Sequence, residues 1–555
     1  GPPPAAYCIE KSMERVNSYR DILKWGDKRE EEVGHQMVTL IKEKFGLTDA
    51  DFREKYLPGT MPVKLDRPSL LKPSQANYLR SVAGEENVLT DDYSRARYSC
   101  GKFYAELLDL RMSHVPDPPD AVVSPRSHDE VVKIVGFCSE EKIPIVPAGG
   151  QSSVTGALRA PHGGIALDLT KHLNGILKIN DVNKTVTVQA GIFGPALEEE
   201  LNRHGYTCGH FPQSFEYSTV GGWVSARGAG QASTGYGKIE DMVVALKAVT
   251  PAGMIETRDF PRTAQGWDIF RLFAGAEGTL GVITEVTLHL FNHAPRNTAS
   301  AAFIFRSFEQ AVESMRRAMQ SEYGRPHLFR ISDPEETDIA FRTSGFDGSV
   351  AEKFLKRLGF KRGSRCLMFV AVEGEKEYAR FVLGKIKRTA RRGKGMYIGG
   401  GPVRKWLAQR YSSAYLRDPL MDLGIMSDTL ETAVTWENLL RVWSAAHEYV
   451  RRRPKAFLMI HISHVYENGA NLYFTFLSPM EKGNERNDFT QFHSGLVETI
   501  LSSGGSISHP HGAGRVHAPW MEGHLGKNSL ELMKAVKRHL DPNNIMNPGG
   551  TLGLL

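Results

Sequence analysis

The sequence predicts an α+β fold built from more than one domain, and three observations support this. The chain has 555 residues, enough for two or more domains with a large core. Short apolar runs alternate with helical patterns over residues 113–297, and glycine-rich loops follow some of these runs. From residue 298 a second series of strands and helices begins, which predicts a separate sheet-and-helix domain.

A helical N-terminal extension is predicted over residues 1–112. Met13–Gly34 is dense in lysine, arginine and glutamate, and Glu31–Phe45 places apolar residues at helical spacing. The proline-rich segment Val115–Asp120 interrupts this pattern. We therefore place the first domain boundary just before that segment.

In residues 113–297, local signals predict individual elements. Ser127 and Glu130 have the spacing of a capping box, which predicts a helix that continues to about Glu140. The apolar run Ile143–Val146 predicts a strand, and the alternation in Thr185–Ala190 predicts another. No Gly-x-Gly-x-x-Gly motif opens a strand–helix–strand unit, so a Rossmann nucleotide site is disfavoured.

Residues 298–503 are predicted to form the second domain, and residues 504–555 a C-terminal segment. The predicted strands of the second domain are Ala301–Phe305, Cys366–Glu373, Leu458–His464 and Leu472–Leu477, and its predicted helices are Phe308–Met319 and Glu375–Lys387. The C-terminal segment contains a predicted helix over about Ser529–Leu540.

The most informative segment is Pro147–Thr155, a glycine-rich loop directly after an apolar strand. Adjacent glycines allow the backbone to approach a ligand closely, and the hydroxyl and N–H groups after them suit a pyrophosphate. Two more glycine-rich segments follow, Ser218–Trp223 and Gly275–Thr284. A single loop of this kind is often only a tight turn, whereas three together favour a ligand site.

The three segments, in this order, resemble the FAD-binding domain of the vanillyl-alcohol oxidase (PCMH-type) flavoprotein family. The resemblance implies FAD as the cofactor and a PCMH-type two-subdomain FAD-binding domain over residues 113–297. It also implies an α/β cap (substrate) domain over residues 298–503 and a tail that returns to the flavin. The implied cofactor-binding residues are Pro147, Gly149, Gly150, Gln151, Ser152, Ser153, Ser214, Thr219, Gly221, Gly222, Glu277, Gly278, Gly281 and Ile283.

Several members of that family tether the flavin through a histidine in or near the first loop. Gln151 stands at that place in this chain. We therefore expect FAD to be bound noncovalently, and a histidine of the cap is the alternative tether.

Side chains able to transfer protons or bind anions occur in the cap and tail. The tail contains His509 and His511, and Tyr473 lies in an apolar strand. Histidine and tyrosine can carry protons, and Arg330 and Arg417 can hold a phosphate or a carboxylate. The spacing of the two tail histidines alone is weak support for a metal ion, and no metal site is predicted.

Each of these residues also has a structural interpretation. Tyr473 is of a type and pattern common in protein cores, and Arg417 can pair with Asp418 or Asp422. His461 and His464 can be hydrogen-bonded structural residues. The sequence pattern alone leaves both interpretations open.

Along nearly its whole length the chain resembles the alkyldihydroxyacetonephosphate synthase family of ether-lipid enzymes. The shared stretches are Asp92–Arg97, Glu216–Ser225, Ala414–Asp418, Ser427–Thr432, Leu472–Phe474 and Gly504–His509. The resemblance implies that the acyl chain of an acyl-dihydroxyacetone phosphate is exchanged for a fatty alcohol through a flavin N5 adduct, without net redox change. It further implies that Tyr473 carries a proton beside His509 and His511, and that Arg330 and Arg417 face the substrate head group.

One position departs from that family. Its tail motif has three consecutive histidines, whereas this chain has Pro510 between His509 and His511. Proline has no side-chain group for proton transfer. Two alternatives therefore stay open: an FAD-linked oxidase or dehydrogenase of a hydroxy acid or other alcohol, and a non-catalytic protein on a flavoenzyme scaffold. The segment Asp541–Pro548 also resembles the D-lactate dehydrogenase and glycolate oxidase relatives.

Composition narrows the cellular setting. Five scattered cysteines without a Cys-x-x-Cys pair argue against a disulfide scaffold and favour a reducing, intracellular compartment. We find no apolar run long enough to span a membrane, and no secretory or peroxisomal signal in this sequence. The synthase interpretation predicts a peroxisome-type organelle in a eukaryote, and the cytoplasm otherwise.

The net charge of +6 is spread thinly, and the densest basic runs are Lys385–Lys394 and Arg451–Lys455. Each run is either a solvated helix face or a contact with an anionic lipid surface. Neither is interleaved with aromatic residues, so nucleic acid is not an expected partner. The expected partners are a lipid-like or small anionic substrate and a second copy of the chain in a homodimer.

Overall fold

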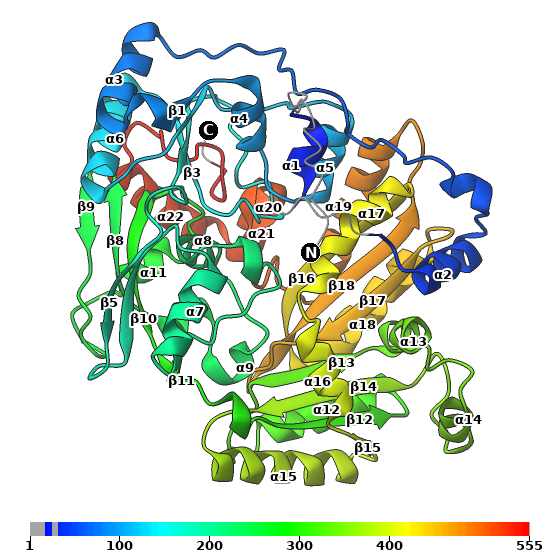
Figure 1. Ribbon diagram of the computed structural model, residues 1–555. Helices are drawn as coiled ribbons and strands as arrows, with labels where there is room; N and C mark the ends of the chain where they lie inside the picture. Colours follow the sequence, from blue (N-terminus) through cyan, green and yellow to red (C-terminus); the bar gives the residue numbers. More distant parts are fainter. Residues whose placement is uncertain (1–16, 25–31, 554–555) are drawn as a thin grey trace, which may run out of the picture.

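The computed structural model describes residues 17–24 and 32–553. Small sheets and their helices form one side of the molecule, and one large sheet with its own helices forms the other (Figure 1). The tail, red in Figure 1, packs back against the first side. The predicted α+β fold is the fold observed, with a separate sheet-and-helix domain after residue 298.

A four-stranded sheet with the order β1-β2-β4-β3 carries the first glycine-rich loop. Strands β2, β4 and β3 run parallel, and β1 pairs with β2 antiparallel. The strands are β1 Val88–Leu89, β2 Ala121–Val123, β3 Ile145–Ala148 and β4 Ile165–Asp168. The helices that precede or join them are α3 Pro73–Ala83, α4 Asp92–Arg97, α5 Tyr104–Arg111 and α6 His128–Glu141.

A five-stranded antiparallel sheet with the order β5-β6-β10-β8-β9 shares one hydrophobic core with the four-stranded sheet. Its strands are β5 Ile176–Asn180, β6 Thr185–Gln189, β8 Val243–Thr250, β9 Gly253–Glu256 and β10 Val282–His289. A small pair, β7 Tyr206–Thr207 and β11 Phe291–Asn292, lies beside it. The associated helices are α7 Gly194–Arg203, α8 Val220–Ala226, α9 Ser233–Tyr236, α10 Ile239–Met242 and α11 Phe270–Phe273.

The helix and the strand predicted before the first glycine-rich loop are both present, and each differs from the prediction in one detail. Ser127 Oγ accepts the N–H of Glu130, as a capping box requires, but the Glu130 carboxylate accepts the N–H of Arg126 instead. The predicted strand at Ile143–Val146 begins two residues later, as β3. The reason is that Ile143 N–H bonds to the end of α6 and the following proline has no N–H to donate.

The cap is built on a seven-stranded antiparallel sheet with the order β15-β12-β14-β13-β17-β18-β16. Its strands are β12 Ala299–Phe305, β13 Leu328–Ser332, β14 Cys366–Val372, β15 Met396–Gly399, β16 Ile425–Thr435, β17 Phe457–Ile462 and β18 Gly469–Pro479. Its helices are α12 Phe308–Met319, α13 Pro334–Thr343, α14 Val350–Arg357, α15 Lys376–Arg392, α16 Gly401–Ala408, α17 Arg417–Asp422, α18 Trp436–Arg451 and α19 Glu485–Ser502.

One face of this sheet is apolar and holds the core of the cap. Alternate residues such as Phe303, Val370, Ile460 and Phe474 are fully buried there, together with the apolar sides of α12, α15, α18 and α19. The residues between them point to the opposite face. Tyr473 is one of these, so the strand predicted around it is present while its side chain lies outside the core cluster.

The two ends of the chain flank these parts. Helices α1 Tyr19–Leu23 and α2 His35–Phe45 belong to the N-terminal extension, whereas much of the charged segment predicted there lies outside the described residues. The tail contains α20 Gly514–His517, α21 Met521–Leu525 and α22 Lys527–Leu540, after which Asn547 N–H bonds to Ile145 O. Four of the five cysteines are described, and all four are free and buried; Cys8 lies outside the described residues.

Candidate active site

The glycine-rich loop after β3 lies against the segment that begins α8. A Cβ atom on Gly149 would come within 2.4 Å of Thr219 Oγ1, and one on Gly150 within 2.0 Å of the Tyr217 carbonyl oxygen. Thr219 caps α8, where its Oγ1 accepts the N–H of Gly222 at 3.3 Å. The two glycines are therefore required for the loop to reach the start of this helix.

The third glycine-rich segment meets the same loop. Gly278 has a φ of 75°, in the left-handed region, and a Cβ atom there would lie 2.9 Å from Cδ of Pro147. Ser152 and Ser153 are half-buried in the loop. The structure thus brings together three segments, the first and last more than 100 residues apart, in a cradle of backbone N–H and hydroxyl groups, which suits a pyrophosphate.

The other predicted cofactor residues are spread around this cradle. Gln151 has a φ of 57°, Ser214 precedes the short 3₁₀ helix Phe215–Tyr217, Gly221 packs on Ala190, Gly281 packs on Val249, and Ile283 lies in β10. The Glu277 carboxylate is engaged elsewhere in the protein. It accepts N–H groups of Ala513 and Gly514 at 3.1 and 2.7 Å and the hydroxyls of Thr155 and Thr551. Glu277 therefore ties the tail to the first loop.

Several buried polar atoms near the segment 212–214 have no hydrogen-bond partner among the described residues. They are both ring nitrogens of His210, Oε1 of Gln231 and the hydroxyl of Tyr411. Gln231 donates to Gln213 at 2.9 Å, and Tyr411 stacks on Phe215. Because buried polar groups are normally satisfied, these atoms favour a polar ligand beside them. Together with the glycine cradle, they fit the FAD that the resemblance implies.

On the cap, three polar side chains form a row across the non-core face of the large sheet. Tyr473 on β18 is the register partner of Glu431 on β16 and of His461 on β17, while Arg330 lies on the next strand, β13. The rings of His461 and Tyr473 stack with centroids 4.6 Å apart. Strand pairing therefore places Tyr473 between a histidine and a carboxylate.

Glu336, on α13, connects Arg330 to this row. Its carboxylate contacts Arg330 Nη2 at 2.5 Å and His461 Nδ1 at 3.2 Å. Burial raises the pKa of Glu336, but His461 and Arg330 outweigh it and hold the pKa at about 2. The carboxylate is thus ionised, and it orients both the arginine and the ring that stacks on Tyr473.

Tyr473 and Arg417 complete the cap side of the site. Burial raises the pKa of Tyr473 to about 12, so the hydroxyl keeps its proton at neutral pH. Arg417 does not pair with the nearby carboxylates that the sequence suggested. It donates to the Lys102 carbonyl and pairs with Asp428 at 2.9 Å, whereas Arg111 holds both Asp418 and Asp422.

The tail brings both predicted histidines to this row. His509 Nδ1 lies 3.0 Å from Glu431 Oε1, and His511 Nε2 lies 3.5 Å from Glu431 Oε2. The His511 ring meets the Tyr473 ring edge-on, with centroids 5.8 Å apart. Burial lowers the pKa of His509 to about 3 and lowers the pKa of His511, so both rings are neutral proton acceptors.

Sequence reasoning missed the two carboxylates of this site. Glu431 lies inside the shared stretch Ser427–Thr432, and Glu336 lies six residues after Arg330. Neither spacing indicates a contact, because each partner arrives from another strand or from the tail. The available signal was an acidic residue within a predicted shared stretch, since a carboxylate that is buried needs a partner.

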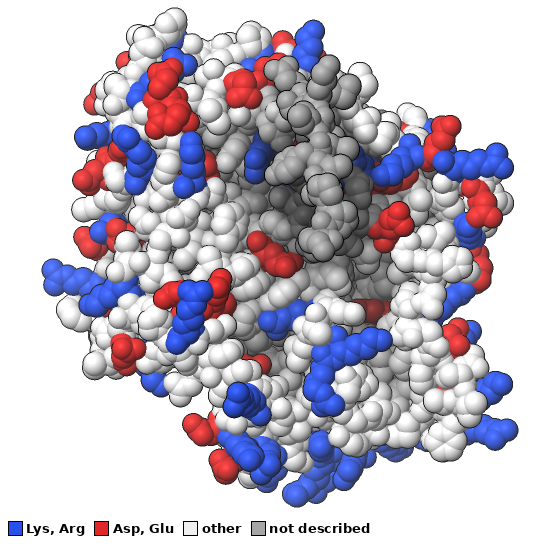
Figure 2. Space-filling model, in the orientation of Figure 1, with Lys and Arg blue, Asp and Glu red and all other residues white. Residues whose placement is uncertain are grey.

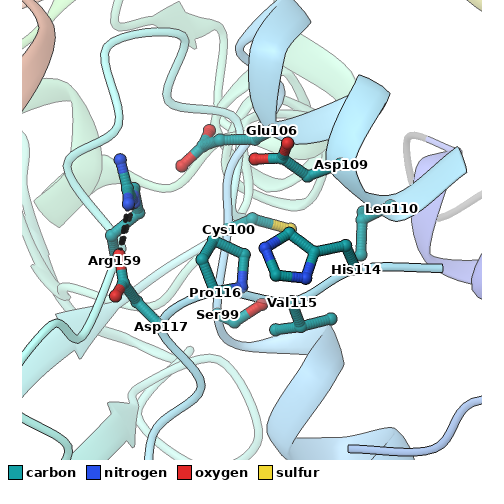
Figure 3. Close-up of a pocket in the computed structure, with 10 residues that line it drawn as sticks. All are labelled: Ser99, Cys100, Glu106, Asp109, Leu110, His114, Val115, Pro116, Asp117 and Arg159. Carbon is teal, nitrogen blue, oxygen red and sulfur yellow. Dashed lines mark hydrogen bonds and ion pairs between the residues drawn. The ribbon is translucent and has the colours of Figure 1, made fainter. Parts of the chain in front are cut away.

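A separate small pocket is lined by α5, by the segments 99–100 and 114–117, and by Arg159 (Figure 3). Glu106 and Asp109 of α5 face it together with Cys100 and His114, while Arg159 pairs with Asp117 at its side. Its free volume is about 250 Å³, including the opening to solvent. Glu106 Oε2 accepts the N–H groups of Gly101 and Phe103, and Oε1 has no partner among the described residues.

Glu106 makes the stability of the protein depend on pH. Burial raises its pKa to about 7 from an ordinary 4.5. Between these values the folded protein holds a proton that the unfolded chain has released, so the free energy of unfolding should fall as pH rises through this window, by roughly 3 kcal/mol. In Glu106→Gln, denaturant unfolding at pH 5, 6, 7 and 8 should show a flatter profile than the wild type. Equal slopes in the two proteins would contradict this role.

Two family models define the class of protein that this fold and site form. Residues 119–258 match the FAD binding domain, and residues 294–551 match the C-terminal domain of FAD linked oxidases. The protein is an FAD-dependent enzyme, as the glycine-rich segments predict. That finding removes the non-catalytic alternative.

The chain belongs to the alkyldihydroxyacetonephosphate synthase family. It is 32% identical over 498 residues to the synthase of Dictyostelium discoideum, covering 86% of this chain and 80% of that protein. It is 30% identical over 539 residues to the synthase of Trypanosoma brucei brucei, covering 93% and 87%. The predicted resemblance is confirmed.

Solved structures agree with this assignment. An alkyldihydroxyacetonephosphate synthase structure matches with a TM-score of 0.81 at 27% identity, over 95% of this chain and 99% of that chain. The substrate-bound p-cresol methylhydroxylase matches with a TM-score of 0.61 at 16% identity, over 88% and 98%, which shows a shared fold. Within the described ranges, no helix is both long and apolar enough to cross a membrane.

Proposed function

We propose that this protein exchanges the acyl chain of an acyl-dihydroxyacetone phosphate for a fatty alcohol, forming an ether lipid precursor. The observation that carries the proposal is the position of Tyr473, between the ring of His461 and the edge of His511 on the polar face of the cap sheet. Arg330 shares that face, and the charge of Arg417 acts on Tyr473. The cationic groups suit a substrate that carries a phosphate, and the proton carrier suits a second substrate that must lose a hydroxyl proton.

The reaction breaks the bond between the substrate carbon and the ester oxygen, and the fatty acid leaves as a carboxylate. The alcohol oxygen bonds to the same carbon and loses its proton. The glycine cradle would hold FAD noncovalently. When bound, the flavin ring would supply the atom to which the substrate carbon bonds during the exchange. Tyr473 passes its hydroxyl proton to the neutral ring of His511 and takes one from the substrate.

The arginines hold the substrate head group in this proposal. Arg417 is fixed by the Lys102 carbonyl and Asp428, and Arg330 by Glu336. Both side chains are only about one-eighth exposed, at 13% and 12%. A partly buried guanidinium is little screened by water and can bind a phosphate through two N–H groups.

FAD-linked oxidation of a hydroxy acid or another alcohol is the second candidate. It is favoured by Pro510, which removes one histidine from the tail motif, and by the match to the FAD linked oxidases over residues 294–551. In that case His509 or Tyr473 takes the hydroxyl proton, and Arg330 or Arg417 holds a carboxylate.

A product assay separates the two candidates. FAD-replete protein is given palmitoyl-dihydroxyacetone phosphate and hexadecanol labelled with ¹⁸O. The expected products are palmitate and an ether ketone that retains the label, in equal amounts. Absence of the ether from protein with intact flavin, together with dye reduction by hydroxy acids or alcohols, would assign the protein to oxidation.

We further propose that the enzyme meets a lipid surface through helix α15. Lysine and arginine side chains gather along the lower edge of the molecule in Figure 2, where α15 runs in Figure 1. Lys385 lies over the ring of Phe381, which is 54% exposed, and Lys387 lies over Tyr397. Cations beside exposed rings suit an anionic membrane surface. A homodimer and, in a eukaryote, a peroxisome-type location complete this proposal.

A further inference from the structure

We propose that Glu431 is the positioning residue of the tail histidines: it orients His509 and His511 beside Tyr473 and balances the charge that a proton brings to either ring. The inference rests on the proposed function of this site. In this proposal, the group that links His509 and His511 across Pro510 is a carboxylate of the cap sheet, and no other tail residue is needed for it.

The first step is how the Glu431 carboxylate is shared. Oε1 accepts hydrogen bonds from Asn471 Nδ2 at 2.7 Å and from His509 Nδ1 at 3.0 Å. Oε2 faces His511 Nε2 at 3.5 Å. One carboxylate therefore spans the gap at Pro510 and contacts the histidine on each side of it.

The second step is that Glu431 is itself held in place. Asn471 is fully buried, and its Oδ1 accepts the backbone N–H groups of Ser463 and His464, each at 2.8 Å. This fixes the amide with its Nδ2 donating to Glu431 Oε1 at 2.7 Å and to Ser463 Oγ at 3.2 Å. The carboxylate is thus held by β18, through an amide that the segment following β17 fixes in place.

The third step is the tautomer of His509. Its Nδ1 faces the carboxylate, and its Nε2 lies 2.7 Å from the hydroxyl of Tyr466. A neutral ring with the proton on Nδ1 donates to Glu431 and accepts from Tyr466, which satisfies all the partners at once. The opposite tautomer would place two acceptors, Nδ1 and the carboxylate, against each other.

The fourth step is the contact with Tyr473. Glu431 and Tyr473 are direct register partners, and the His511 ring lies edge-on to Tyr473. A proton that leaves Tyr473 for His511 creates a cation beside the Glu431 carboxylate, which is only 1% exposed. Such a charge is stabilised strongly because little water screens it.

The same atoms admit another occupant, a divalent cation. One ligand atom each from Glu431, His464 and His509 lies within 4.8 Å of the others. The hydrogen bonds favour a site without a metal ion, because Asn471 and His509 already direct N–H groups at Glu431 Oε1. Metal occupancy is therefore one outcome of the test.

Kinetics of two variants test the positioning role. Glu431→Gln should lower kcat roughly 10- to 100-fold, the range known for groups that orient a functional histidine, with KM and FAD content unchanged. Glu431→Asp, which keeps the charge, should recover part of the loss. Glu352→Gln is the matched control: it is another buried carboxylate of the cap, paired with Arg365, and should lower the melting temperature only.

A second measurement does not depend on turnover. In protein labelled with ¹⁵N-histidine, the His509 signal, assigned with His509→Asn, should show the proton on Nδ1, and Glu431→Gln should abolish that pattern. An unchanged tautomer, a kcat within threefold of the wild type, or one equivalent of divalent metal in the purified protein would each overturn the proposal. If the wild type forms no ether product, the proposed function fails, while the tautomer still tests Glu431.

Discussion

Replacement of Tyr473 by phenylalanine is expected to lower kcat by at least about 100-fold while FAD stays bound. Removing a general acid or base costs roughly 10²- to 10⁴-fold in rate. The substitution removes only the hydroxyl, so the stack on His461 and the edge contact with His511 remain. Steady-state kinetics with the ether substrates measure the rate, and the visible flavin spectrum measures the bound cofactor.

Tyr449→Phe is the matched control for this prediction. Its hydroxyl donates to the Phe492 carbonyl at 3.0 Å, in the helical layer of the cap, away from the polar row. Loss of that bond should cost about 1 kcal/mol of stability and leave kcat unchanged. Near-normal turnover of Tyr473→Phe would remove Tyr473 from the mechanism and favour a histidine as the proton carrier.

Replacement of Gly150 by alanine is expected to weaken FAD binding strongly. The new Cβ would lie 2.0 Å from the Tyr217 carbonyl oxygen and 3.1 Å from the Phe193 ring. Because the nearest atom is backbone, the loop or the segment before α8 has to move. Overpacking of this kind costs on the order of 1–3 kcal/mol. If this cost is paid by the FAD-bound form, it corresponds to roughly a 5- to 150-fold loss of affinity for FAD.

Gly136→Ala is the control for this change. It lies in α6 of the same part of the protein, no atom comes within 4 Å of its added Cβ, and alanine favours a helix by up to about 1 kcal/mol over glycine. FAD titration monitored by fluorescence should give a wild-type dissociation constant for this variant. A Gly150→Ala protein that purifies with a full complement of FAD would show that the cradle tolerates a side chain.

The sequence predicted helices and strands correctly where neighbouring residues in the chain determine them. The Ser127 cap predicts α6, and the apolar run Cys366–Glu373 predicts β14 to within a residue. Two predicted boundaries shifted. Strand β3 begins at Ile145, after Ile143 N–H has bonded to the end of α6, and the tail residue Ile545 accepts the N–H of Ile145. Helix α15 continues to Arg392, beyond the expected end at Lys387.

The candidate site divides in the same way. The sequence identified Tyr473, His509 and His511 through their residue types and a family resemblance, but it suggested the wrong partners for Arg417. The structure pairs this arginine with Asp428, because Arg111 from α5 already neutralises Asp418 and Asp422. Partners of a buried charge depend on which other charges reach the same place, and spacing along the chain does not carry that information.

The sequence by itself predicted the cofactor, because the glycine-rich segments are visible motifs that carry a family resemblance. The reason for the glycines lies in distant contacts, such as that of Gly150 with Tyr217. The sequence also determined the alternation of the cap strands. Only the tertiary structure decided the chemistry beside the flavin-binding part. Antiparallel register places His461, Tyr473 and Glu431 side by side, and Arg330 follows on the same face of the next strand, two residues from Ser332, the partner of His461. Arg330 and Tyr473 are 143 positions apart in the sequence. Register is set by pairing among whole strands, so no local pattern records it.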